Sequence, residues 1–270
     1  MTISEIMTTS ISTITSGKSV SYAAEQMNED NTRWLVVIDH GVVMGVVTSR
    51  DVLSAHPNRI VADAMSGYPS RFSADLNVWE AHSYLQENNG EVALIMDGER
   101  LIGVLTKEAV RVKIAEFIDP LTGLYEAPYI QYVGEQFLKE NIPFHLLFID
   151  LNDFGQINKK HGHPFGDDVI RRYSSVLASF AAEKGDHLCR YAGDEFVMIS
   201  TADEDQVQKG IALLTQPTHI RNVRISAAVG HVNGYEEPDF FSYSLRDLME
   251  KASLESSAAK IQNDYPTFTT

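Results

Sequence analysis

Cysteine is almost missing from this chain of 270 residues, because Cys189 is its only one. A single cysteine cannot form a disulfide within the chain, which favours a reducing compartment. The sequence also has no apolar run long enough to span a bilayer, and we expect no secretory leader. We therefore expect a cytoplasmic protein that does not cross a membrane.

Positive charge is scarce as well. Lys and Arg number 22 against 37 Asp and Glu, which gives a formal net charge of −15. Binding to nucleic acid or to an anionic membrane surface depends on positive charge that releases counterions. The composition therefore predicts that neither is a general partner. It does not exclude a nucleotide, which a few local groups and a divalent cation can hold.

The first half of the chain contains an internal duplication. A shift of 58 positions places Met7 on Met65 and Gly45 on Gly103 without a gap. Each copy is expected to hold an extended leading segment, a helix, two short strands and a closing helix, because helical and then extended apolar spacings follow one another. The expected helices and strands before the closing helices are 20–28, 34–39 and 42–48, then 78–88, 92–96 and 101–106.

This plan resembles a tandem pair of cystathionine-β-synthase (CBS) domains over residues 1–118, with repeats at about 1–57 and 58–118. The resemblance implies two β-α-β-β-α units that pack sheet to sheet and leave two clefts. Such clefts often bind adenine nucleotides, and CBS pairs often dimerise. An adenine nucleotide is therefore an expected ligand of the first half.

The resemblance also indicates which cleft would hold the ligand. In the family, a Gly-x-x-Thr-x-x-Asp pattern binds the ribose, and the first copy matches it with Gly45, Thr48 and Asp51. The second copy has Ala109 at the Asp position. A carboxylate accepts two ribose hydroxyl hydrogen bonds and an alanine side chain accepts none, so Thr48 and Asp51 are the expected anchors. Helix capping alone would select the same residue types, and a dimerisation scaffold without ligand is the alternative.

The second half predicts a separate domain. Pro120 and Gly123 interrupt the chain, so we place the boundary near Ile118, with domains over 1–118 and 119–270. Helices and strands alternate beyond it but include a hairpin, which predicts an α/β fold with mixed (α+β) sheets flanked by helices. The expected helices are 127–139, a short one after residue 150, 167–182, 204–214 and 245–261, and the expected strands are 144–149, 188–191, 196–199 and 223–229.

Acidic residues stand where ligands commonly bind. Asp150 follows a buried strand, and the turn at Gly193 presents the adjacent carboxylates of Asp194 and Glu195. Carboxylate oxygens suit a hard cation. Hairpins also carry Gly-Asp for conformational reasons alone, and Asp150 could cap the turn after it. The pair His161-x-His163 has no further ligand nearby in sequence, which favours a structural role.

Several motifs in order resemble the GGDEF domain of diguanylate cyclases, from Asp119 to about Asp264. The motifs are Asp119-x-Leu121-Thr122-Gly123-Leu124, Asp150-x-x-x-Phe154-x-x-Ile157-Asn158, His163-x-x-Gly166-Asp167 and Ala192-Gly193-Asp194-Glu195-Phe196. The family joins two GTP molecules into cyclic di-GMP on a nucleotidyl-cyclase-like mixed sheet. A homodimer is implied, because each domain supplies one GTP half-site.

The resemblance implies a metal site beside a proton acceptor. Asp150, Leu151 and Asp194 would belong to the metal site, with Mg²⁺ as the ion and Mn²⁺ as the alternative. Asp194 and Glu195 are the implied catalytic residues, and Glu195 would assist the metal or accept the proton of the attacking ribose 3′-hydroxyl. Two ions would lower the pKa of this hydroxyl and offset charge on the pyrophosphate.

The resemblance also implies how GTP is held. Asn158 and Asp167 would read the guanine edge, since an amide donates and accepts while a carboxylate accepts from the guanine N1 and N2 donors. Backbone amides near Phe154 and Gly155 would hold the β and γ phosphates, and Lys260 would pair with phosphate. Asn158 as a surface residue and Asp167 as a helix cap are the alternatives.

A few positions depart from the family pattern. Ala192 replaces the first glycine of the signature, which a tight turn tolerates. Gly155 and Asp264 stand where the family often has Lys and Arg, which should weaken triphosphate binding. Glu183 replaces the Arg of an Arg-x-x-Asp product site that ends here at Asp186, so weak or absent product inhibition is expected.

The sequence thus predicts a bacterial diguanylate cyclase regulated by nucleotide binding to a CBS pair. The expected reaction condenses two GTP to cyclic di-GMP and releases pyrophosphate. The alternative is a catalytically weak or inactive GGDEF domain that acts as a nucleotide-binding regulatory or dimerisation module.

Overall fold

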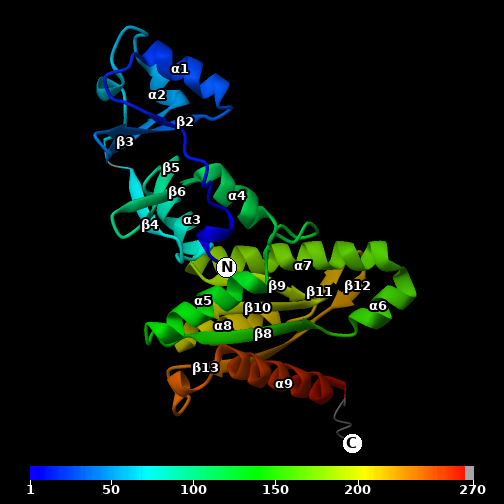
Figure 1. The fold of residues 1–270 in the computed structure, drawn as a ribbon. Coiled ribbons are helices and arrows are strands. Elements are labelled where there is room, and N and C mark those ends of the chain that lie inside the picture. Colours follow the sequence, from blue (N-terminus) through cyan, green and yellow to red (C-terminus); the bar gives the residue numbers. More distant parts are fainter. Residues whose placement is uncertain (68, 265–270) are drawn as a thin grey trace, which may run out of the picture. The chain divides into compact units, whose positions relative to one another are not determined.

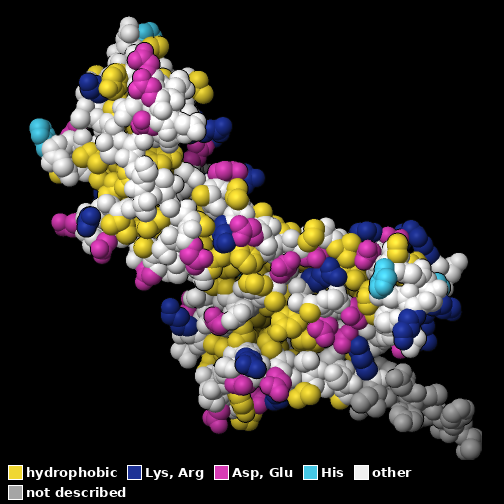
Figure 2. Space-filling model, turned by 45° about the vertical axis from the view of Figure 1, so that its right-hand side comes forward, with side chains coloured by type: hydrophobic (Ala, Val, Ile, Leu, Met, Phe, Trp, Pro, Cys, Tyr) yellow, Lys and Arg dark blue, Asp and Glu magenta, His cyan; other side chains and the backbone are white. Residues whose placement is uncertain are grey.

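The computed structural model describes residues 1–67 and 69–264, and the side chains within them except those of 183, 184 and 261–264. The chain divides into two compact units, Met1–Glu116 and Phe117–Thr270 (Figure 1). Both combine helices with mixed sheets, which confirms the predicted fold class. Among the described helices, none is both long and apolar enough to cross a bilayer. Acidic side chains are spread over the surface seen in Figure 2, as the net charge of −15 leads one to expect.

The first unit contains two three-stranded sheets of the same plan, ordered β1-β2-β3 and β4-β5-β6. In each, the first pair of strands is parallel and the second is antiparallel. The elements are β1 (Thr13–Ile14), α1 (Val20–Glu29), β2 (Trp34–Asp39), β3 (Val42–Thr48) and α2 (Ser49–Ser54), then β4 (Ser70–Ser73), α3 (Val78–Glu87), β5 (Val92–Asp97), β6 (Arg100–Thr106) and α4 (Lys107–Ala115), with short 3-10 helices at Ile3–Glu5 and Val61–Asp63.

The leading segment of each repeat, around Thr8 and around Ser66, pairs with a strand of the other repeat. Thr8 forms a bridge with Val104 in the second repeat, whereas Ser66 forms one with Val46 in the first. Glycines permit this approach, because a Cβ on Gly45 would lie 2.5 Å from the Ser66 carbonyl oxygen. An apolar cluster that includes side chains from both sheets then joins the repeats. Its buried members are Trp34, Val36, Val46, Leu94 and Val104.

The second unit is built on a five-stranded sheet in the order β13-β8-β10-β9-β7. The pairs β13–β8, β8–β10 and β10–β9 are antiparallel and β7–β9 is parallel. Its elements are β7 (Tyr125–Glu126), α5 (Ala127–Lys139), β8 (His145–Leu151), α6 (Phe154–His161), α7 (His163–Lys184), β9 (His187–Ala192), β10 (Glu195–Ser200), α8 (Glu204–Leu214), β11 (Thr218–Ile220), β12 (Val223–Ile225), β13 (Ala227–Asn233), a 3-10 helix (Phe240–Ser242) and α9 (Leu245–Asp264).

Helices cover both faces of this sheet (Figure 1). Along β8, Leu147 and Ile149 pack in a cluster with residues of α7 and α8, whereas Leu146 and Phe148 pack in a cluster with residues of α5 and α9. The alternation is that of a strand with both faces buried. Asp150 lies two residues after Phe148 on the same strand, so its side chain lies on the same face of the sheet as Phe148 and projects toward α9.

One predicted strand is wrong in its extent. The expected strand 223–229 is divided into β12, which ends at Ile225, and β13, which begins at Ala227. β12 pairs with β11 in a separate two-stranded sheet, and the sequence did not predict β11. The turn between β11 and β12 consists of Arg221 and Asn222, with φ of 45° and 67°. Two successive positive φ values produce a hairpin of the I′ type, whose usual glycine is missing here. The long helix also begins earlier than expected, at His163, because Pro164 occupies its first turn.

Candidate active site

The strand register brings the predicted carboxylates together. Asp150 near the end of β8 lies opposite Glu195 at the start of β10, and Asp194 stands in the turn just before Glu195. Gly193 has φ +53°, and among the described residues no neighbouring atom lies within 4 Å of where its Cβ would be. The turn is therefore open on the side that a ligand would approach.

An arginine holds this turn in place. The Arg190 guanidinium donates to the Gly193 carbonyl oxygen through Nε at 2.9 Å and Nη2 at 2.7 Å, and it pairs with Asp119 at 2.7 Å. Burial acts to raise the pKa of Asp119, but hydrogen bonds from Thr122 and the charge of Arg190 hold that pKa below its ordinary value. The sequence did not predict this clamp, because Arg190 lies outside the motifs and 71 residues from Asp119.

The carboxylates perturb one another. Burial and the charge of Asp150 raise the pKa of Asp194, while burial and the charges of Asp150 and Asp194 raise the pKa of Glu195. A cation between them would relieve this repulsion. Carboxylates beside a backbone carbonyl are the oxygen ligands that Mg²⁺ and Mn²⁺ prefer, so the donor set fits a divalent ion.

Lys260 reaches this carboxylate group from α9. Its Nζ lies 2.7 Å from Asp150 Oδ2 and donates to the Leu151 carbonyl oxygen at 3.1 Å. The sequence predicts a contact with phosphate for this residue, whereas in the structure it contacts two residues of the expected metal site. The contact shows that a positive charge is accommodated beside Asp150 and Leu151.

The expected phosphate loop is the start of α6. Asp153 takes a left-handed backbone conformation, φ 55° and ψ 21°, and the helix begins at Phe154. The first amides of a helix have no partner within it and favour anions. Within the described part of the chain, a Cβ on Gly155 would meet no atom within 4 Å, so a larger side chain could stand there.

The expected guanine contacts lie where α6 meets α7. The Asn158 carboxamide packs against Gly166, since a Cβ there would lie 1.9 Å from Asn158 Oδ1. Asn158 Oδ1 is buried without a hydrogen-bond partner among the described residues. It could therefore accept a hydrogen bond from a ligand. Asp167 is half-buried within α7 rather than at its N-cap, which is Gly162. The capping alternative for Asp167 is therefore wrong.

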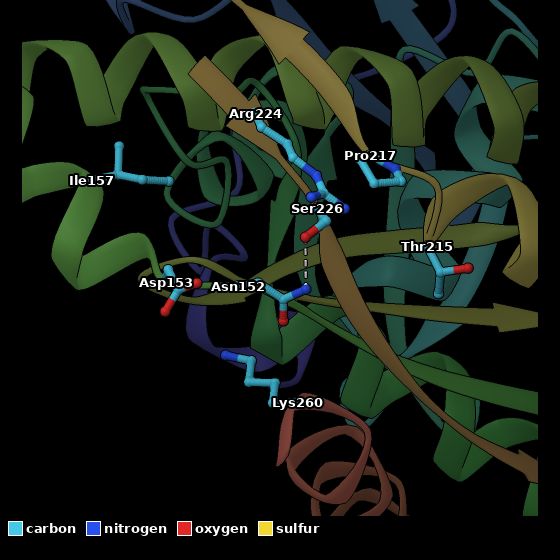
Figure 3. Close-up of a pocket in the computed structure, with 8 residues that line it drawn as sticks. All are labelled: Asn152, Asp153, Ile157, Thr215, Pro217, Arg224, Ser226 and Lys260. Atoms are coloured by element: carbon cyan, nitrogen blue, oxygen red, sulfur yellow. Dashed lines mark hydrogen bonds between the residues drawn. The ribbon is translucent and has the colours of Figure 1, made fainter. Parts of the chain in front are cut away.

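A cavity of about 430 Å³ borders the phosphate loop (Figure 3). Arg224 from β12 and Lys260 from α9 supply its positive charge, and Arg224 was missed because no motif contains it. Asn152 donates through Nδ2 to Ser226 at 2.9 Å, while its Oδ1 is buried without a partner among the described residues. The side chains of Asp264 and Glu183, on which two sequence expectations rest, lie outside the described part of the chain.

A second candidate site lies in the first unit. Thr48 and Asp51 line a cavity of about 490 Å³ that also includes residues of the second repeat, such as Tyr84. Thr48 donates to Asp51 Oδ2 through both its amide and its hydroxyl at 2.8 Å. The two residues therefore cap α2, as the alternative interpretation expects, and they also face a cleft of nucleotide size.

The structure thus combines an α/β fold with a group of carboxylates, Asp150, Asp194 and Glu195, and a cavity that Lys260 lines. The family model described as "Diguanylate cyclase, GGDEF domain" matches residues 116–261, more than half of the chain, and the chain belongs to this family. A CBS domain model matches residues 3–58. Both findings confirm the family resemblance that the sequence indicates.

Individual relatives are more distant. The chain is 29% identical to the Escherichia coli diguanylate cyclase DgcZ over 120 residues, 43% of this chain and 39% of that protein. It is 26% identical to the Vibrio cholerae diguanylate cyclase VdcA over 165 residues, 57% of this chain and 44% of that protein. The match thus spans less than half of either relative. Among solved structures, the CBS domains of a Streptococcus pneumoniae transcriptional regulator match 42% of this chain and 98% of that chain, at 21% identity and a TM-score of 0.37.

Proposed function

We propose that this protein is a diguanylate cyclase that condenses two GTP molecules to cyclic di-GMP, with nucleotide binding to its CBS pair as the regulatory input. The observation that carries the proposal is the pairing of Asp150 with Glu195 across β8 and β10, with Asp194 beside them. Membership of the GGDEF family supports the same reaction. The proposed domains are residues 1–118 and 119–270.

The chain's own residues have distinct tasks in this reaction. Asp150, Asp194 and the Leu151 carbonyl would hold Mg²⁺, which when bound lowers the pKa of the 3′-hydroxyl and offsets charge on the pyrophosphate. Glu195, whose pKa is raised by burial and by the charges of Asp150 and Asp194, would accept the 3′-hydroxyl proton. The Asn158 amide would donate to and accept from the guanine edge, and the Asp167 carboxylate would accept from the guanine N1 and N2 donors.

The triphosphate would lie between the start of α6 and the cavity beside it. Amides of Phe154 and Gly155 would contact its oxygens, and Lys260 and Arg224 would supply charge from α9 and β12. Arg224 would thereby replace part of the charge that the family often places at the positions of Gly155 and Asp264. Lys260 would move from Asp150 to phosphate once a metal ion takes its place.

The proposed reaction requires two copies of the chain. Each GGDEF domain would hold one GTP, so each 3′-hydroxyl must meet the α-phosphate held by the other copy. A homodimer is therefore part of the proposal.

Product formation tests the proposal directly. The full chain is incubated with GTP and Mg²⁺, and cyclic di-GMP and pyrophosphate are followed by chromatography. Asp194→Asn should abolish both products while preserving the shape of the turn. Asp205→Asn on α8 is the matched control, because it removes the same charge outside the site. Equal product from wild type and Asp194→Asn would contradict the assigned site.

A catalytically silent GTP-binding regulator is the second candidate. It is favoured by Gly155, where the family often has a lysine, and by the pairing of Lys260 with Asp150. GTP binding without product, at saturating GTP and with either Mg²⁺ or Mn²⁺, would establish this alternative.

A further inference from the structure

A cluster of metal-binding side chains lies at the opposite end of β8 from Asp150. His145 begins β8, His231 lies in β13, and Glu204 is the first residue of α8. In the strand register, His145 pairs with Asn233 and His231 pairs with Leu147. Residues two apart on a strand share a face, so both imidazoles project toward the α8 side of the sheet. None of the GGDEF motifs includes these residues.

The donor atoms are already close together. His145 Nδ1 lies 3.1 Å from His231 Nε2 and 3.6 Å from Glu204 Oε2, and one ligand atom from each residue falls within 4.8 Å of the others. A tetrahedral zinc ion with bonds of about 2.0 to 2.1 Å separates its ligand atoms by about 3.3 Å. Small side-chain adjustments would therefore bring the three donors onto one ion.

The surroundings suit neutral imidazole ligands. The His145 side chain is 1% exposed, and burial lowers the pKa of both His145 and His231 against the opposing charge of Glu204. Neutral imidazole is the form that binds metals. Glu204 is 40% exposed, which leaves a path from solvent to the cluster.

Neighbouring groups orient the three donors. Asn233 Nδ2 donates to Glu204 Oε2 at 2.5 Å and Gln208 Nε2 donates to Glu204 Oε1 at 2.6 Å. Gln208 also lies 3.3 Å from His231 Nδ1, and the Tyr235 ring lies 5.1 Å from the His145 ring. Contacts of this kind fix ring orientation and carboxylate direction around metal ions in proteins.

We propose that His145, Glu204 and His231 bind one divalent transition-metal ion of the zinc type, with water completing its coordination. Two imidazoles and a carboxylate favour zinc over Mg²⁺, which prefers oxygen ligands only. The site is distinct from the carboxylate site, because Asp150 is five residues further along β8, about 16 Å at 3.3 Å per residue. The ion would tie β8, β13 and α8 together at the end of the sheet remote from the GTP site.

Metal binding by the full chain tests the proposal without relying on activity. Chelator-treated protein is titrated with Zn²⁺ by calorimetry in excess Mg²⁺, which competes for the carboxylate site, and Co²⁺ replaces Zn²⁺ for visible spectroscopy. We expect one ion per chain, the intense absorption of tetrahedral Co²⁺ and a higher Tm with Zn²⁺. His231→Gln should lower the Zn²⁺ affinity by at least about 100-fold, since changes merely next to ligands already cost 10- to 100-fold.

Control variants separate this site from other histidines. His161→Gln and His219→Gln remove exposed imidazoles elsewhere and should bind Zn²⁺ like the wild type. Glu204→Gln keeps the shape of a half-exposed ligand and provides a second test if His231→Gln does not fold. Absence of Zn²⁺ binding by the wild type, or unchanged binding in both site variants, would show a hydrogen-bonded histidine pair and overturn the proposal.

Discussion

At the turn between β9 and β10, one guanidinium fixes the position of the signature acids. Arg190 satisfies the Gly193 carbonyl oxygen and a buried carboxylate, Asp119, at the same time. The pair is largely buried, with side-chain exposures of 16% and 12%, so either partner would be left as a poorly solvated charge without the other. The carboxylate contact also ties the signature turn to the start of the GGDEF unit.

We predict that Arg190→Ala lowers both stability and turnover. Loss of charge-assisted hydrogen bonds to a buried carboxylate should cost about 2 kcal/mol of unfolding free energy, measured by urea denaturation. Turnover should fall more than GTP affinity, because Arg190 positions the turn and is not proposed to contact GTP. The double variant Arg190→Ala with Asp119→Asn should recover part of the stability, and a purely additive double-mutant cycle would contradict the clamp.

A second prediction concerns the missing positive charge at the phosphate loop. Gly155→Lys adds a cation at a position where a Cβ meets no atom of the described residues within 4 Å, so it should fit without strain. GTP should bind several-fold more tightly, as seen in a lower KM. Gly155→Gln is the matched control, since any side chain at this helical position also raises helix propensity over glycine. Equal KM values for the two variants would show that the loop does not contact the triphosphate.

At the scale of the element, β8 holds polar side chains at both ends of an otherwise apolar strand. Its interior residues are buried on both faces, which makes it rigid, while His145 and Asp150 stand where the chain enters and leaves the sheet. β10 runs beside it and brings Glu195 to the same edge as Asp150. Asp150, Asp194 and Glu195 therefore concentrate negative charge at this edge of the sheet.

The raised pKa of Asp194 predicts that the metal-free protein loses stability as pH rises. Asp194 has a pKa raised above its ordinary value of 3.8, so its ionisation destabilises the metal-free fold as pH rises through that value and above. Asp194→Asn should therefore raise the Tm of the metal-free chain at pH 8. The gain should shrink at acidic pH, where Asp194 is protonated in the wild type. The comparison uses thermal melts in chelator with Asp205→Asn as control, and a lower Tm at pH 8 would refute it.

Periodicity and turn chemistry predicted most elements of both units. The bounds of α5, α8, β2 and β3 match those expected, because their apolar spacing is regular and their ends carry ordinary signals. The hairpin of β11 and β12 escaped prediction, since Arg221 and Asn222 form its turn without a glycine. The sequence also did not predict the pairing of Thr8 with Val104 and of Ser66 with Val46, because each pair joins one repeat to the other.

The sequence predicted the residues of the candidate site that lie within its local motifs. Asp150, Asp194 and Glu195 meet because their strands pair, which the order of motifs in the family already implies. Arg190 and Asp119 are 71 residues apart, and Arg224 enters the cavity from a hairpin outside every motif. The grouping of His145, Glu204 and His231 likewise depends on strand register and on the placement of α8, which no local pattern encodes.

At the scale of the whole molecule, the CBS pair and the GGDEF unit each contain a candidate nucleotide site. Regulation requires that a nucleotide near Asp51 bind the competent and incompetent states of the GGDEF unit with different affinity. Asp51→Asn should weaken binding of AMP, measured by calorimetry on the full chain, because an amide accepts fewer ribose hydroxyl bonds than a carboxylate. Ala109→Asp should in turn create binding in the second repeat, whose Thr106 already matches Thr48. Unchanged AMP affinity in Asp51→Asn would contradict the assigned cleft.

Coupling between the two sites makes a reciprocal prediction. If AMP changes the affinity for GTP by a given factor, GTP must change the affinity for AMP by the same factor, because both follow from one coupling free energy. Asp194→Asn allows both affinities to be measured without turnover, with Mg²⁺ present throughout. Typical coupling energies of about 1–3 kcal/mol correspond to factors of about 5 to 150. Equal factors that differ from one in both titrations would establish the CBS pair as a regulator of GTP binding. AMP binding that leaves the GTP affinity unchanged would limit its effect to turnover or to dimerisation.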